Sequence, residues 1–75
     1  MTRKRYVKLL MACGLPRNYC QAAACVAREI GPSYRADMED WLNSFRIRWL
    51  FALKDEDSKY FSRCIDILRQ ALGVE

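Results

Sequence analysis

Apolar and polar residues alternate along this chain with the three- and four-residue spacing that is typical of amphipathic helices. Four segments carry the pattern: residues 2–13, residues 16–30, a stretch that begins at Ser33, and a stretch that follows a polar turn at residues 54–57. No pair of segments resembles two strands joined by a hairpin turn. The pattern therefore predicts an all-α fold, a compact bundle of about four helices in a single domain that spans residues 1–75.

Residues with defined capping roles mark the ends of these helices. Glycine can adopt the left-handed backbone that often ends a helix, and proline fits the first turn of a helix. Residues of these two types fall at the predicted boundaries, at Gly14, Pro16, Gly31, Pro32 and Gly73. Ser33 is a good N-cap for the third helix, and Asp55 is expected to cap the fourth.

Each helix is expected to turn one apolar stripe towards a common core. The predicted inward residues are Tyr6, Leu9, Leu10 and Cys13 in the first helix, Tyr19, Ala23, Val26 and Ile30 in the second, and Phe61, Cys64, Ile65, Leu68 and Leu72 in the fourth. The second helix also carries alanines at positions 22–24 and at Ala27, and these would let a neighbouring helix approach closely.

Residues 43–54, with the sequence NSFRIRWLFALK, fit two different periods. Phe45, Ile47 and Trp49 alternate with arginines, as in a half-buried strand. A stripe at helical spacing nevertheless covers the whole segment and consists of Tyr34, Met38, Trp41, Leu42, Phe45, Trp49 and Ala52. The longer pattern predicts a helix, the longest of the four, with Trp41 and Trp49 largely shielded in the core.

The helical interpretation gives the third helix a second apolar side. Ile47, Leu50 and Phe51 point away from the first stripe, and Arg46 and Arg48 flank them. Either another helix of the same chain covers this side, or a partner molecule does. These five residues form the candidate partner-binding surface, and a homodimer is the simplest closed arrangement for it.

Charge is distributed unevenly along the chain. Residues 1–28 contain six basic residues and no acidic one, whereas residues 29–75 contain seven basic and nine acidic residues, so the net charge of +4 arises in the first part. Such an end can meet phosphates, an acidic protein or anionic lipid, or can serve as a solvated face. The candidate residues for binding nucleic acid or an acidic partner are Lys4, Arg5, Lys8, Arg17, Asn18 and Gln21.

The cysteines do not form a metal-binding pattern. Cys13, Cys20, Cys25 and Cys64 include no C-x-x-C pair, and the sequence contains no histidine, so we expect no metal and no cofactor. The basic opening lacks the continuous apolar run of a signal peptide, and no run approaches membrane-spanning length. We therefore expect a cytoplasmic protein with reduced thiols and no membrane partner.

Residues suited to catalysis are scarce. A nucleophile would lack a histidine base, and neither a glycine-rich phosphate loop nor a G-x-S-x-G motif is present. The acidic clusters at residues 37–40 and 55–57 lie at helix starts, where the helix dipole favours carboxylates. The sequence therefore predicts a non-enzymatic protein that acts by binding.

A DNA-binding regulator is one alternative. Residues 6–25, YVKLLMACGLPRNYCQAAAC, can be aligned with a helix-turn-helix motif. Arg17, Asn18 and Gln21 would then lie exposed at the start of the recognition helix, and side chains of these types read base edges. Leu10 makes the alignment less favourable, because close crossing of the two helices usually requires alanine or glycine there. A small structural or assembly protein is a further alternative.

The opening RKRYVKLLMACGLPRN, residues 3–18, resembles the start of small proteins that phages and prophages of Gram-positive bacteria encode. This resemblance implies an accessory role for the phage inside a bacterial host cell. Some phage proteins of this size inhibit host defence, including CRISPR nucleases. The leading hypothesis is therefore an anti-CRISPR-type inhibitor that binds a protein or nucleoprotein target. The resemblance implies no functional residues.

Overall fold

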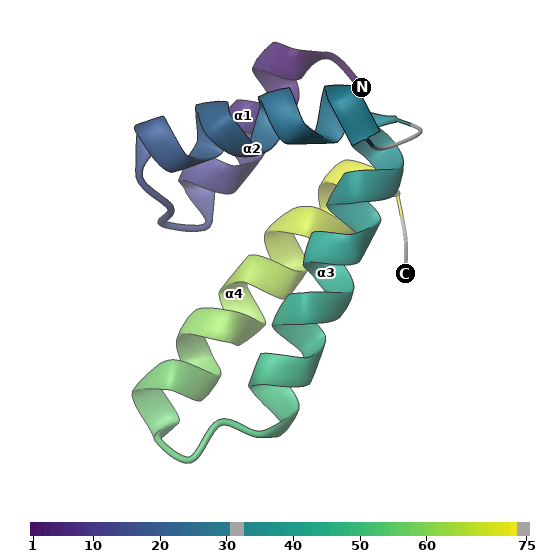
Figure 1. Ribbon diagram of the computed structural model, residues 1–75. Coiled ribbons are helices and arrows are strands. Elements are labelled where there is room, and N and C mark those ends of the chain that lie inside the picture. The colour runs from purple at the N-terminus through teal and green to yellow at the C-terminus, as the bar shows by residue number, and fades with distance from the viewer. Residues whose placement is uncertain (31–32, 74–75) are drawn as a thin grey trace.

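Four helices account for most of the chain in the computed structural model, which describes residues 1–30 and 33–73. They are α1 (Arg3–Ala12), α2 (Arg17–Ile30), α3 (Tyr34–Leu50) and α4 (Asp55–Leu72), and Figure 1 shows their arrangement. Neither described part of the chain contains a strand, so the predicted all-α fold of four helices is confirmed. The predicted break at Gly31 and Pro32 lies outside the described residues.

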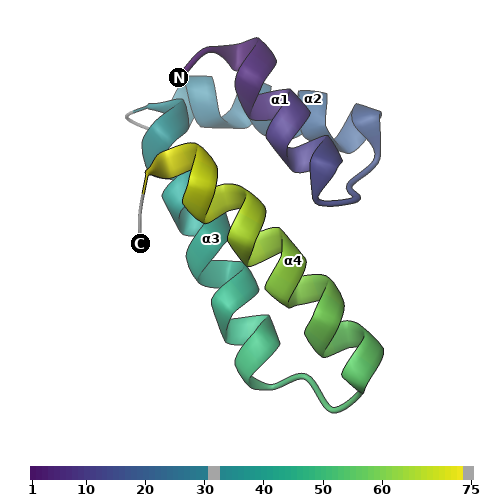
Figure 2. The same ribbon diagram turned by 180° about the vertical axis from the view of Figure 1, so that it is seen from behind.

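The helices α3 and α4 form an antiparallel hairpin, and α1 and α2 lie across the end of that hairpin where α3 begins and α4 ends (Figures 1 and 2). At this covered end, the Arg35 guanidinium donates a hydrogen bond of 2.7 Å to the carbonyl oxygen of Leu72. The opposite end, where α3 ends and α4 begins, projects beyond α1 and α2 (Figure 1). The hairpin therefore has one covered end and one free end.

Several helix ends follow from local capping chemistry. The Ser33 hydroxyl accepts a hydrogen bond of 3.0 Å from the Ala36 amide, as expected for an N-cap, and the Thr2 hydroxyl accepts one of 3.2 Å from Arg5. Gly73 ends α4 in the left-handed region with φ of 70°. The prediction that Asp55 caps α4 is wrong, because Lys54 holds the N-cap position and Asp55 is the first helical residue. There its carboxylate still interacts favourably with the helix dipole.

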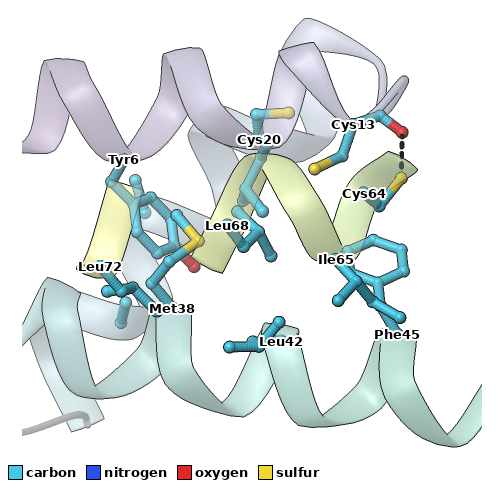
Figure 3. Packing of buried hydrophobic residues seen from close by; sticks show 13 residues of the cluster. Tyr6, Cys13, Cys20, Met38, Leu42, Phe45, Cys64, Ile65, Leu68 and Leu72 are labelled. Carbon is cyan, nitrogen blue, oxygen red and sulfur yellow. Dashed lines mark hydrogen bonds between the residues drawn. The ribbon is translucent and has the colours of Figure 1, made fainter. Parts of the chain in front are cut away.

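All four helices contribute side chains to one core (Figure 3). The buried residues are Tyr6, Leu10, Cys13, Cys20, Ala24, Ala27, Met38, Leu42, Phe45, Cys64, Ile65, Leu68 and Leu72. The predicted stripe of α4 is thus confirmed, with Phe61 packed partly buried at its edge, and so is that of α1, with Leu9 partly buried.

The predicted inward face of α2 is wrong. Tyr19, Val26 and Ile30 are exposed, and Ala23 is only partly buried. The buried face instead consists of Cys20, Ala24 and Ala27. The physical reason is size: a face of small side chains lets the backbone of α2 approach its neighbours closely, and this face lies towards the core.

Two predictions for α3 also need correction. The helix has 17 residues, one fewer than the 18 of α4, because it ends at Leu50, with Phe51 as its C-cap. Trp49 is not shielded but 46% exposed, whereas Trp41 is partly buried. Phe45 is the last buried residue of α3. Trp49 lies in the last turn of α3. This end of the helix projects beyond α1 and α2 (Figure 1).

Candidate functional site

The free end of the hairpin carries an apolar surface that consists of Ile47, Leu50 and Phe51, which we call the α3-end surface. These side chains are 59%, 69% and 73% exposed, and Leu53 in the following loop is 99% exposed. Leu50, the last residue of α3, and Phe51, its C-cap, follow Ile47 at spacings of three and four residues, which places the three on one side of the helix end. Of the two alternatives left by the sequence, burial against another helix is therefore ruled out for the described chain.

The two arginines beside this surface lie over different grooves. Arg46 lines a groove of about 420 Å³ between α3 and α4, together with Trp49, Leu50, Ser62, Ile65, Asp66 and Arg69. Arg48 lines a groove between α2 and α3. The only ion pair within residues 1–30 and 33–73 joins Arg35 and Glu39, at 3.6 Å. Both guanidinium groups beside the α3-end surface are therefore free of a carboxylate partner within that part of the chain.

One of the residues that line the α3–α4 groove, Arg69, carries a buried donor. The Nε atom of Arg69 is buried and has no hydrogen-bond partner among the described residues. A buried N–H group without an acceptor is energetically unfavourable by about 1–3 kcal/mol.

A second groove, between α1 and α2, is basic. Its lining residues are Arg3, Lys4, Val7, Lys8, Met11, Arg17 and Gln21, and its volume is about 630 Å³. We call it the α1–α2 groove. No acidic residue lines it.

The α1–α2 groove brings together only part of the predicted basic site. Lys4 and Lys8 are four residues apart, as are Arg17 and Gln21, so each pair shares one helix face. Arg5 and Asn18 are each one position further along, which turns them about 100° away, and they do not line the groove. Sequence reasoning missed Arg3, although it precedes Lys4 in the same basic run.

The turn between α1 and α2 fixes how these two helices meet. Gly14 has φ of 92°, in the region that favours glycine. The Tyr60 hydroxyl of α4 donates a hydrogen bond to the carbonyl oxygen of Cys13, and the Cys20 thiol donates one of 3.6 Å to that of Leu15. The side chain of Leu10 is fully buried in the core. The orientation of the basic groove therefore depends on contacts with α4.

The groove between α2 and α3, of about 520 Å³, was not predicted. It is lined by Tyr6, Tyr19, Ala22, Ala23, Val26, Asp37, Asp40, Trp41, Ser44 and Arg48. Sequence reasoning missed it because it placed Tyr19 and Val26 in the core. At its base, the Trp41 indole donates a hydrogen bond of 3.1 Å to the Tyr6 hydroxyl, which itself donates to Asp37.

The Tyr6 hydroxyl is a structural group rather than an acid. Burial, and then its hydrogen bond to Asp37, raise the pKa of Tyr6 well above its ordinary value of 10.0. The hydroxyl therefore keeps its proton at neutral pH and holds α1 against α3.

The cysteines are all free thiols, and three of them are buried. The Cys64 thiol donates a hydrogen bond of 3.5 Å to the Cys13 carbonyl oxygen (Figure 3). Burial, with a smaller contribution from neighbouring Cys64, raises the pKa of Cys13 to about 12. Cys13 is therefore a protonated, poorly nucleophilic group at neutral pH. Among the described residues, no three histidine, cysteine or acidic side chains lie close enough together to hold a metal ion.

Comparison of the chain with known protein families, with curated proteins and with solved structures gives no match. Of the helices that the structure describes, none is both long and apolar enough to cross a membrane.

Proposed function

We propose that this protein is a small, non-enzymatic binding protein that docks onto a protein partner through the α3-end surface. The observation that carries the proposal is the exposure of Ile47, Leu50 and Phe51 at the end of α3, followed by the exposed Leu53 in the next loop. Removing apolar area from water favours association, and the surplus over the freedom lost on binding stabilises the complex. A cluster of such residues at a projecting end of the molecule is typical of an interaction site.

The groups around the α3-end surface define the chemistry of the partner. Arg46 and Arg48 flank it, and arginine is enriched in interfaces because its planar head forms directed hydrogen bonds while its stem packs on apolar atoms. Arg46 and Arg69 also line the adjoining groove between α3 and α4. The partner surface is therefore apolar at its centre, with carboxylate or carbonyl oxygens at its rim.

The resemblance of residues 3–18 to phage proteins gives this proposal its most specific form. In that form the partner is a macromolecule of the bacterial host, such as a CRISPR nuclease, and the protein inhibits it by occupying a functional surface. Such a nucleoprotein offers protein surfaces to the α3-end surface. It also offers nucleic acid close by.

The test is DNA cleavage by a panel of purified, guide-loaded CRISPR nucleases, with and without this protein. The wild type is expected to inhibit at least one of them. Phe51→Glu places a charge at the centre of the contact, and its inhibition constant should rise by about 30-fold or more, as for an interface hot spot.

Ile30→Glu is the matched control for this test. Ile30 is 81% exposed and ends α2, at the covered end of the hairpin, far from the α3-end surface (Figure 1). The change introduces the same charge and should leave inhibition intact. Equal inhibition by Phe51→Glu and the wild type would exclude the α3-end surface as the contact. Absence of inhibition across the panel would exclude a nuclease of that panel as the target.

A further inference from the structure

We propose that the α1–α2 groove binds the phosphate backbone of nucleic acid without reading its sequence. This site is separate from the α3-end surface and does not depend on the function proposed above. Four cationic side chains, Arg3, Lys4, Lys8 and Arg17, line one concavity between two helices.

The charge of the groove is not neutralised by the described chain. None of the seven residues that line it is acidic, and residues 1–28 contain no acidic residue at all. The one ion pair in the described ranges, between Arg35 and Glu39, lies elsewhere. Four like charges in one groove repel one another. A bound polyanion would attract all four and offset that repulsion.

The shape of the groove favours a strand-like polyanion over a lipid surface. Val7 and Met11 line the same concavity as the basic residues, so its apolar and cationic atoms belong to one hollow surface. A membrane is flat on this scale and is bound by cations and apolar groups that project outwards. A nucleic-acid backbone is narrow enough to enter a concavity between two helices.

The spacing of the cations suits repeated phosphates. Lys4 and Lys8 are separated by about 6 Å along α1, at 1.5 Å per residue. Phosphates follow one another at about 3.4 Å along each strand of a duplex, so this separation corresponds to about two nucleotides. A single small anion would engage only one end of such a row.

The composition of the groove favours contacts with phosphates rather than with bases. Lysine and arginine form most phosphate contacts, which position a protein on nucleic acid without selecting a sequence. Of the two amide side chains suited to reading adenine, Asn18 and Gln21, Asn18 does not line the groove. Gln21 is the only amide side chain in it.

The experiment measures binding of the full chain to a short fluorescein-labelled DNA duplex by fluorescence anisotropy, across a range of salt concentrations. With four phosphates neutralised, the logarithm of the association constant should fall with the logarithm of salt concentration with a slope of about −3.6. Between about 50 and 200 mM salt, affinity should therefore drop by roughly 150-fold. Duplexes of unrelated sequence should bind with equal affinity.

A pair of double variants distinguishes the effect of the groove cations on DNA binding from the effect of the protein's net charge. Lys4→Gln with Lys8→Gln removes two groove cations, and the salt slope should become shallower by about 1.8. The control is Lys59→Gln with Arg63→Gln, which removes two exposed cations, also four residues apart, from α4. Both lower the net charge equally, and Gln has a helix propensity close to those of Lys and Arg. The control should retain the wild-type slope.

Three outcomes would overturn the proposal. One is no binding of the duplex by the wild type at low salt, and another is equal weakening by both double variants. The third is a sequence preference that Asn18→Ala abolishes, because bases would then be read outside the groove. Absence of DNA binding together with binding to vesicles that contain anionic lipid would overturn the proposal in the first of these ways. Phe51→Glu should bind DNA like the wild type, so failure here is distinguishable from failure of the proposed function.

Discussion

At the scale of single residues, the turn between α1 and α2 depends on the absence of a side chain at Gly14. Its φ of 92° is unfavourable for other residues, and a Cβ atom there would lie 3.0 Å from the Tyr60 hydroxyl oxygen. That hydroxyl cannot move away freely, because it donates a hydrogen bond to the Cys13 carbonyl. The turn is therefore constrained both by backbone geometry and by a neighbour from α4.

We expect Gly14→Ala to destabilise the protein more than Gly73→Ala does. Gly73 also has positive φ, of 70°, but a Cβ atom there would meet no atom within 4 Å. The left-handed conformation alone makes alanine unfavourable by about 1–2 kcal/mol, and the contact with Tyr60 should add about 1 kcal/mol at Gly14. Urea unfolding followed by circular dichroism measures both changes.

The background variant Tyr60→Phe tests the cause of that difference. Without the hydroxyl oxygen, the nearest atom of Tyr60 to the new Cβ would be a ring carbon at 3.4 Å, which is ordinary contact. Gly14→Ala should then lower the free energy of unfolding by less than it does beside Tyr60. If Gly14→Ala lowers the free energy of unfolding equally in both backgrounds, the backbone conformation alone accounts for the destabilisation.

At the scale of helices, those features that depend on neighbouring residues in the sequence could be predicted. The Ser33 cap, the Gly73 end and the buried stripe of α4 all follow from spacing within a few residues. The grouping of Lys4 with Lys8, and of Arg17 with Gln21, follows from the same spacing. That these two pairs face each other across one groove depends on how α1 packs against α2, which spacing alone does not give.

The buried face of α2 could not be found by ranking residues by hydrophobicity. Tyr19, Val26 and Ile30 offer more apolar area than Ala24 and Ala27, yet the alanines are buried. In a core of four short helices, the distance between helix axes limits the size of the side chains between them. The same rotation of α2 exposes Tyr19 and Val26 and creates the α2–α3 groove.

Close packing of α2 predicts a large loss of stability for leucine at Ala24 and almost none for leucine at Ala22. Ala24→Leu would introduce three extra carbon atoms where the side chain is fully buried, and should destabilise the fold by about 1–3 kcal/mol. Ala22→Leu places the same atoms at an exposed position and should change the stability by no more than about 0.5 kcal/mol. Chemical denaturation compares the two. A similar loss at both positions would mean that α2 is not held by its small residues.

At the scale of the whole molecule, the arrangement of the two helix pairs separates the two proposed binding surfaces. The basic groove lies between α1 and α2, and the α3-end surface lies at the free end of the α3–α4 hairpin (Figures 1 and 2). Whether Ile47, Leu50 and Phe51 are exposed depends on how far along the hairpin α1 and α2 lie. Helix packing of this kind cannot be read from the sequence, so the sequence left open whether another helix covers these residues. Their helical spacing was enough to identify the three residues as a second apolar side of the helix.

The exposure of this surface predicts how the isolated protein behaves without its partner. A two-fold axis would bring the same apolar residues of two copies together, which closes the surface in the simplest way. Arg46 and Arg48 precede the loop at the hairpin end and Asp55, Glu56 and Asp57 follow it, so basic groups of one copy can meet acidic groups of the other. We therefore expect weak, concentration-dependent dimers of the wild type in light scattering.

Phe51→Glu should abolish these dimers and leave the fold intact. Because Phe51 is 73% exposed, a carboxylate at this position stays in water, and the free energy of unfolding should change by no more than about 0.5 kcal/mol. Light scattering should give a monomer at every concentration, with the helical circular dichroism spectrum of the wild type. Unfolding of this variant would contradict the exposure of Phe51, because a buried, unpaired carboxylate is unfavourable by several kcal/mol, comparable to the whole stability of a small domain. A wild type that is monomeric throughout would restrict the α3-end surface to partners other than a second copy.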